Sequence, residues 1–227
     1  MTDFARLMSD YFVKYLAGQK GSGSNTMKTY RDTFVQLLEF MDEKKHISAD
    51  CIEVDSFSYD IINEFLEYLE KEKRVSISTR NNRLAAIRSF FKYTGYHEPK
   101  YLNISTSIRE ISKKKIEGRQ MNYLSVNAME HFLNSFDKTD HKELRCFCIV
   151  LLLYESGARV TELCNVRRYD LHLEKPYTMI LHGKGDKIRS VPLDGLVADV
   201  ISNYIQKYRV DDNDFLFFNT RRERLTR

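Results

Sequence analysis

The chain has 227 residues, of which 42% are hydrophobic and 30% charged, with three prolines, nine glycines and a net charge of +4. This length predicts one large domain or two small ones, and the composition excludes disordered, collagen-like and low-complexity chains. No apolar run approaches the roughly 18 residues of a membrane-spanning helix, and the amino terminus lacks the features of a signal peptide. We therefore expect a soluble cytoplasmic protein with no membrane association.

Helical periodicity dominates the first 96 residues, and no strand pattern interrupts it. Residues 1–96 are therefore predicted to form a small helical domain. Its four helices are expected around residues 4–12, 30–41, 61–69 and 84–95, with a glycine-rich loop at 18–24.

Residues 97–120 carry Pro99, scattered Ser and Thr, and the triplet Lys113, Lys114 and Lys115, but no apolar stripe. We expect this stretch to be a basic linker between two domains.

The second domain, residues 121–227, is expected to combine helices with one small sheet. The run CFCIVLLLY at 146–154 is apolar all round, which is typical of a helix buried at the centre of a domain. Residues 177–182 and 188–193 are predicted to form a hairpin of two strands joined by a glycine-bearing loop. Further helices are expected at 129–136, 159–166 and 196–205.

The net charge of +4 conceals two opposite segments. Residues 32–72 carry 12 acidic and 3 basic side chains, whereas residues 73–120 carry 12 basic and 3 acidic ones. A charge run is often only a solvated face, but this one-sidedness also makes a polyanionic partner a candidate.

Three groups of residues need more than a packing explanation. In the first, SGARVTEL, Arg159 follows a tight turn after the most apolar segment, and Glu162 lies three residues further on. Such a pair is an ordinary weak contact on a surface helix, but beside an apolar segment it is more often functional.

In the second group, Lys184 stands between two glycines at the tip of the predicted hairpin. It could neutralise a phosphate oxygen or donate a proton to a leaving group, although hairpin tips carry lysine simply because they are exposed. The third group is a helix start rich in donors for phosphates and base edges, which also suits solvated capping residues: Arg80, Asn81, Arg83, Arg88 and Lys92.

Together these features resemble the tyrosine recombinases of the phage integrase family. SGARVTEL is similar to the arginine box of that family, GKGDKIRSVPL is similar to its lysine hairpin, and the amino-terminal helices resemble its SAM-like core-binding domain. The resemblance implies a mainly α fold, in which the helical domain precedes an α+β catalytic domain with a small antiparallel sheet.

The resemblance also implies roles. Arg159 would clamp the scissile phosphate, Lys184 would protonate the leaving 5′ oxygen, and Glu162 would orient the arginine. Family members break and rejoin DNA through a 3′-phosphotyrosyl link, work as tetramers on DNA, and need neither metal nor nucleotide. The residues expected to contact double-stranded DNA, while the linker closes around it, are Arg80, Asn81, Arg83, Arg88, Lys92, Lys113, Lys114 and Lys115.

Two parts of the family pattern are missing. None of the six histidines is followed three residues later by arginine, and the last tyrosine, Tyr208, precedes the element that family members place ahead of the second arginine box. We therefore expect a truncated recombinase without its nucleophile, monomeric in solution, which binds DNA without cutting it. The alternatives are a natural non-catalytic DNA-binding remnant and a helical protein-interaction module.

The cysteines show no metal-ligand spacing, and no nucleotide-binding or hydrolase motif is present. Buried free thiols are expected at Cys51, Cys146, Cys148 and Cys164, and no cofactor is expected.

Overall fold

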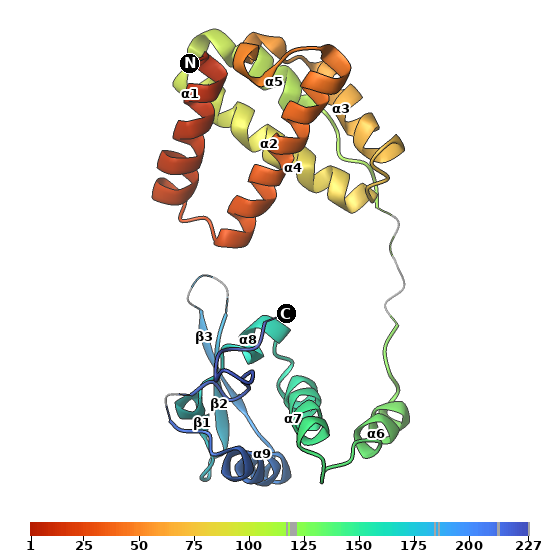
Figure 1. Ribbon diagram of the computed structural model, residues 1–227, viewed down its shortest axis with the longest axis vertical. Helices are drawn as coiled ribbons and strands as arrows, with labels where there is room; N and C mark the ends of the chain where they lie inside the picture. The colour runs from red at the N-terminus through yellow and green to blue at the C-terminus, as the bar shows by residue number, and fades with distance from the viewer. Residues whose placement is uncertain (117, 119–121, 184, 186, 213, 227) are drawn as a thin grey trace. The chain divides into compact units, whose positions relative to one another are not determined.

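The computed structural model divides the chain into two compact units, Met1–Gln120 and Met121–Arg227 (Figure 1). It describes residues 1–116, 118, 122–183, 185, 187–212 and 214–226. Each unit has a hydrophobic core of its own. Among the described residues, no helix is both long and apolar enough to cross a bilayer.

The first unit is helical, and the four expected helices are confirmed. Serine or threonine begins three of them, because Thr2, Ser58 and Ser76 each accept a hydrogen bond of 3.2 Å from the backbone N–H three residues later. The elements are α1 (Asp3–Asp10), which continues as the π-helix Tyr11–Gln19, then α2 (Ser24–Lys45), α3 (Tyr59–Lys71), α4 (Ile77–His97) and α5 (Leu102–Glu110).

Helix α4 runs through the centre of this unit. The ring of its Phe90 meets the rings of Phe4, Tyr11, Phe34 and Phe91 at centroid distances of 5.3–5.5 Å, all edge-to-face. Such pairs add about 0.5–1.5 kcal/mol each beyond their buried area. The aromatic cluster thereby joins α1, α2 and α4.

Residues 97–111 differ from the predicted linker. They form a short 3-10 turn and α5, and Tyr101, Ile108 and Ile111 are buried in the core of the first unit. Helix α4 also continues beyond the predicted end at Gly95. A Cβ at Gly95 would lie 2.6 Å from Ser105 Oγ, so the glycine allows α5 to pack closely on α4. The apolar spacing of residues 101, 104, 108 and 111 is the helical stripe that the sequence interpretation missed.

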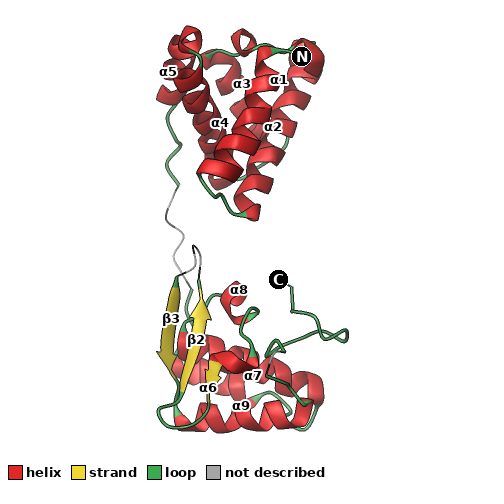
Figure 2. Cartoon of the chain, turned by 90° about the vertical axis from the view of Figure 1, so that its left-hand side faces the viewer, coloured by secondary structure: helices red, strands yellow, loops and turns green. Residues whose placement is uncertain are grey.

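The second unit places a three-stranded antiparallel sheet, in the order β1-β2-β3, against helices (Figure 2). The predicted hairpin is confirmed, with Met179 paired to Val191 across β2 and β3, and Leu171 of β1 pairs with Met179 on the other side. The elements are α6 (Val126–Asn134), α7 (His141–Ser156), α8 (Val160–Leu163), β1 (Leu171–His172), β2 (Thr178–His182), β3 (Ile188–Pro192) and α9 (Gly195–Tyr208).

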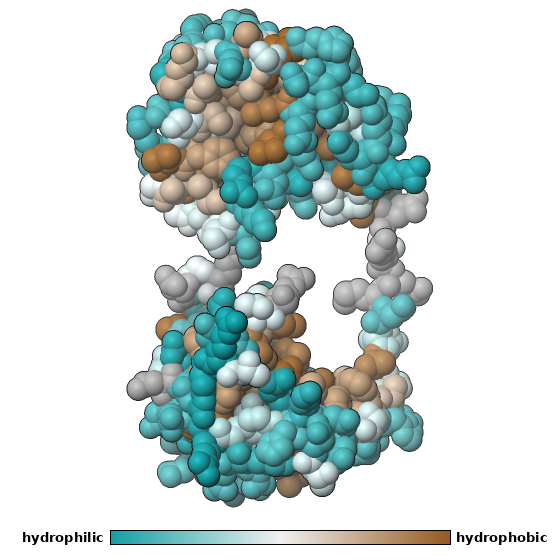
Figure 3. All heavy atoms as spheres, viewed as in Figure 1, coloured by the Kyte–Doolittle hydropathy of each residue, from teal (hydrophilic) through white to brown (hydrophobic). Residues whose placement is uncertain are grey.

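Helix α7 is buried on one side only, so the expectation of a fully buried helix is wrong. Its buried residues are Leu144, Phe147, Cys148 and Leu152. Figure 3 shows apolar surface over α6 and α7. Phe132 on α6 and Tyr154 on α7 have exposed side chains. The four cysteines are free, but only Cys148 is buried, whereas Cys51 and Cys146 are exposed and Cys164 is intermediate.

Candidate active site

Arg159 is positioned by the turn between α7 and α8. Helix α7 ends at Gly157, which takes a left-handed conformation (φ 58°) and donates its N–H to the carbonyl oxygen of Leu153. Arg159 then has an extended backbone at the start of α8, and its side chain is 73% exposed. The turn thus presents a guanidinium to solvent.

Glu162 is buried beneath that guanidinium, with a side chain only 4% exposed. Its Oε1 accepts a hydrogen bond of 2.7 Å from Arg159 Nη1, while its Oε2 accepts from the Arg159 backbone N–H at 3.0 Å and from Arg189 Nη2 at 2.8 Å. The Arg189 hydrogen bond, followed by that of the Arg159 backbone N–H, lowers the pKa of Glu162 to about 2. Glu162 therefore remains ionised and ties the start of α8 to β3.

Arg189 was missed by the sequence interpretation. It lies on the outer strand β3, paired with Leu181 of β2, and 27 residues separate it from Glu162 in the chain. The available signal was a basic residue within the second strand of the predicted hairpin.

Gly183, the first residue of the loop that joins β2 to β3, lies against the carboxylate. A Cβ added there would be 3.3 Å from Glu162 Oε1 and 3.3 Å from the Lys187 carbonyl oxygen. A glycine at this position therefore lets the hairpin approach Glu162 closely. Lys184 lies outside the described residues.

A second buried carboxylate lies beside the hairpin. Asp170 accepts a hydrogen bond of 2.8 Å from the Arg167 backbone N–H, and its Oδ1 is 3.3 Å from Nε2 of His182, the last residue of β2. The sequence interpretation singled out neither residue. Asp170 therefore joins the 3-10 turn Arg168–Asp170 to β2, as Glu162 joins α8 to β3.

Two of the expected DNA-contacting residues are not at the surface. The side chains of Arg80 and Asn81 are buried and bond to the chain segment at 112–114, so the structure corrects their assignment as DNA contacts. A buried guanidinium that is already paired cannot reach a phosphate without local unfolding.

The remaining basic candidates are partly or fully exposed. Arg83 donates to the Thr29 carbonyl oxygen at 2.9 Å, and Arg88 donates to the carbonyl oxygen of Arg109. Lys92, Lys113, Lys114 and Lys115 are exposed, and among them Lys114 pairs with Glu70.

Tyr208 is held at the end of α9. Its hydroxyl donates to the His141 carbonyl oxygen, its ring stacks on Tyr204, and burial raises its pKa. The side chain of Tyr208 therefore packs between Tyr204 and the start of α7. Within the described part of the chain, no group of three or more His, Cys, Asp or Glu side chains could hold a metal ion.

Comparison with known proteins defines the class. Residues 122–227 match the model of the phage integrase family, and residues 10–99 match that of the phage integrase N-terminal SAM-like domain. The tyrosine recombinase XerD of Listeria innocua is 30% identical over 232 residues, covering 96% of this chain and 72% of the relative. The chain belongs to the tyrosine recombinases of the phage integrase family.

Further similarities agree with this family. XerC of Staphylococcus aureus is 27% identical over 96% of this chain and 71% of its own length. The fold is similar to that of the XerH recombinase bound to palindromic difH substrate (TM-score 0.69, 23% identity, 96% of this chain and 63% of that one). It is also similar to that of the lambda integrase dimer bound to a COC′ core site (TM-score 0.69, 14% identity, 100% of this chain and 59% of that one). This chain spans 63% of the XerH chain and 67% of the relative that it matches over 222 residues.

Proposed function

We propose that this chain binds double-stranded DNA at a recombination site and carries one half of the catalytic residues of a strand-exchange enzyme. The observation that supports this most is the pairing of exposed Arg159 with buried Glu162 beside Gly183, the first residue of the loop in which the sequence carries Lys184. A fixed guanidinium suits phosphoryl transfer, where catalysis depends on positioning and on stabilising charge in the transition state.

In this proposal each residue of the arginine box and the hairpin has a distinct task. Arg159 donates to the scissile phosphate and stabilises the charge that develops on its oxygens. Glu162 holds Arg159 from beneath. Lys184 donates a proton to the leaving 5′ oxygen. Neither a metal ion nor a nucleotide takes part, so chelators leave binding unchanged.

The DNA-contacting residues of the first unit are, in this proposal, Arg83, Arg88, Lys92, Lys113 and Lys115. Duplex binding through several phosphates weakens log-linearly with salt. Gel shifts over a salt series test this, with a steep decline expected. No shift at low salt would overturn the DNA-binding proposal and favour a helical protein-interaction module.

The 227-residue chain is further proposed to bind DNA without forming a covalent link, because no tyrosine follows Tyr208 and no His-x-x-Arg box follows the hairpin. A nicked suicide substrate tests this, since a cleaving recombinase accumulates a covalent protein–DNA adduct on it. No adduct is expected, and an adduct would overturn the assignment.

We propose that the free chain is a monomer and that tetramers form only on DNA. Sedimentation of the chain with and without DNA measures its oligomeric state.

A further inference from the structure

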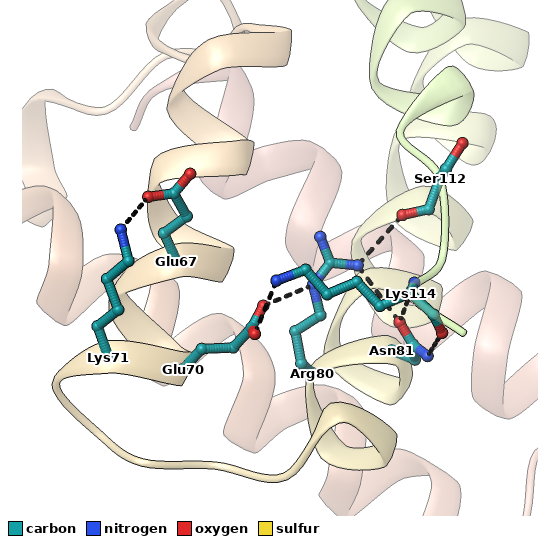
Figure 4. A network of polar contacts seen from close by, with 7 residues as sticks. All are labelled: Glu67, Glu70, Lys71, Arg80, Asn81, Ser112 and Lys114. Atoms are coloured by element: carbon teal, nitrogen blue, oxygen red, sulfur yellow. Dashed lines mark hydrogen bonds and ion pairs between the residues drawn. The ribbon is translucent and has the colours of Figure 1, made fainter. Parts of the chain in front are cut away.

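The backbone of residues 112–114, where the lysine triplet starts, is hydrogen-bonded to side chains of the helical unit (Figure 4). Asn81, in the second turn of α4, forms hydrogen bonds with both backbone groups of Lys114. Its Oδ1 accepts from the Lys114 N–H at 3.1 Å, and its Nδ2 donates to the Lys114 carbonyl oxygen at 2.8 Å. Two residues earlier, the Ser112 carbonyl oxygen accepts from Arg80 Nη1 at 3.2 Å. The chain is therefore held at residues 112 and 114.

Two ion pairs that share Glu70 complete this attachment. Arg80 Nε lies 3.3 Å from Glu70 Oε1, an electrostatic contact rather than a well-aligned hydrogen bond, and Glu70 Oε2 accepts from Lys114 Nζ at 2.8 Å. The Arg80 side chain is only 6% exposed, so its charge depends on Glu70 for compensation. We call Glu70, Arg80 and Asn81 the clasp, and residues 112–115 the basic segment.

Because of the clasp, the three lysines of the triplet differ in their surroundings. The ammonium of Lys114 pairs with Glu70, a partner that it shares with Arg80, whereas the side chains of Lys113 and Lys115 flank this pair and are exposed. Within the clasp, Asn81 and Arg80 bind the backbone, so these two residues fix the course of the basic segment whatever side chains it carries, and Glu70 adds a contact to the Lys114 side chain. Two cations are thus presented from an ordered chain instead of a free linker.

We propose that Asn81 and Arg80 are positioning residues, which order the basic segment so that Lys113 and Lys115 contact DNA phosphates while Lys114 stays bound to Glu70. The proposal rests on the proposed DNA binding and adds the source of the order in the segment. Ordering a flexible segment at binding has an entropic cost, and a segment that is already ordered avoids much of that cost.

The test compares two neighbouring asparagines in the full chain. Asn81→Ala removes both hydrogen bonds to Lys114 without changing the net charge, and Asn82→Ala is the matched control because Asn82 is exposed. In the free protein, hydrogen exchange of the Lys114 amide is expected to accelerate at least tenfold in Asn81→Ala and to stay unchanged in Asn82→Ala. Affinity for a generic duplex is expected to fall about three- to tenfold in Asn81→Ala only, with an unchanged salt slope.

Single lysine substitutions form the second arm. Lys113→Ala and Lys115→Ala should each lower the slope of log affinity against log salt by about one, and Lys114→Ala should leave it nearly unchanged. This arm uses surface residues, so it decides the proposal even where Asn81→Ala disturbs folding. A Lys114→Ala effect equal to that of Lys113→Ala would contradict the division of the triplet.

The outcomes also separate this inference from the function on which it rests. Unchanged exchange at Lys114 in Asn81→Ala overturns the clasp, whether or not DNA binds. Faster exchange with unchanged affinity overturns the positioning role. Failure of the wild-type chain to shift DNA overturns the proposed function, and the exchange measurement still reports on the clasp.

Discussion

Glu162 lies between two arginines that differ in their surroundings. Arg159 is 73% exposed and meets the carboxylate with its side chain and its backbone N–H, whereas Arg189 reaches it from the neighbouring strand. Burying a carboxylate is costly unless charged partners and hydrogen bonds compensate for the lost hydration. Both are present here, so the site holds a permanent negative charge that fixes two cations.

The low pKa of Glu162 makes the stability of the second unit depend on pH. Because its folded pKa is about 2 and its ordinary value is 4.5, the ionised carboxylate stabilises the fold above about pH 4.5. That contribution is lost as the pH falls from there towards 2. Urea unfolding should show a smaller stability at pH 3 than at pH 7, and Glu162→Gln should reduce this difference. Exposed Glu174→Gln is the control, and equal pH dependence in both variants would contradict the assignment.

The two arginines should also contribute unequally to stability. Arg189→Leu removes the hydrogen bond that lowers the Glu162 pKa most, and we expect a lower free energy of unfolding because the buried carboxylate loses a charged partner. Arg159→Leu should cost less, because the Arg159 side chain is exposed and its backbone N–H still donates. Urea unfolding of both single variants and the double variant measures this. A larger cost for Arg159→Leu would show that Arg189 is not the main partner.

At the scale of the elements, polar caps decide where helices start. Asp140 begins α7 by accepting hydrogen bonds from the N–H groups of Lys142 (2.8 Å) and Glu143 (2.9 Å), and these bonds hold its pKa below the ordinary value. Asp140→Ala should therefore destabilise the second unit by about 1 kcal/mol. Exposed Asp199→Ala, on α9, is the matched substitution and should cost much less. Equal melting temperatures for the two variants would contradict this role of Asp140.

Local patterns in the sequence predicted the elements whose contacts are local. Helices α1 to α4 of the first unit and the hairpin at 178–192 follow from periodicity, and the family follows from the arginine box and the hairpin motif. Helix α5 was missed because its stripe is short and interrupted by Ser and Thr. The pairing of Glu162 with Arg189 was beyond reach because it depends on how β3 packs beside α8. Arg80 was misassigned for a similar reason, since the chain that buries it returns 32 residues later.

At the scale of the whole chain, each unit is organised around its own cluster of buried side chains. Phe90 is fully buried among the rings of the first unit, and Leu181 is fully buried between the sheet and the helices of the second. No residue belongs to both of the described clusters. The free energy that holds each unit folded therefore comes mainly from contacts within that unit.

Because the two cores are separate, we predict that a cavity in one unit leaves the other unit folded. Phe90→Ala should cost about 3–5 kcal/mol and Leu181→Ala about 2–5 kcal/mol, each in its own unit. Hydrogen exchange in mild denaturant should accelerate in peptides from α4 for Phe90→Ala and in peptides from β2 for Leu181→Ala. Each variant is the control for the other, since they make similar cavities in different cores. Acceleration of both sets of peptides by either variant would mean that the two units unfold as one cooperative structure, because a shared transition transmits the loss of stability to every buried amide.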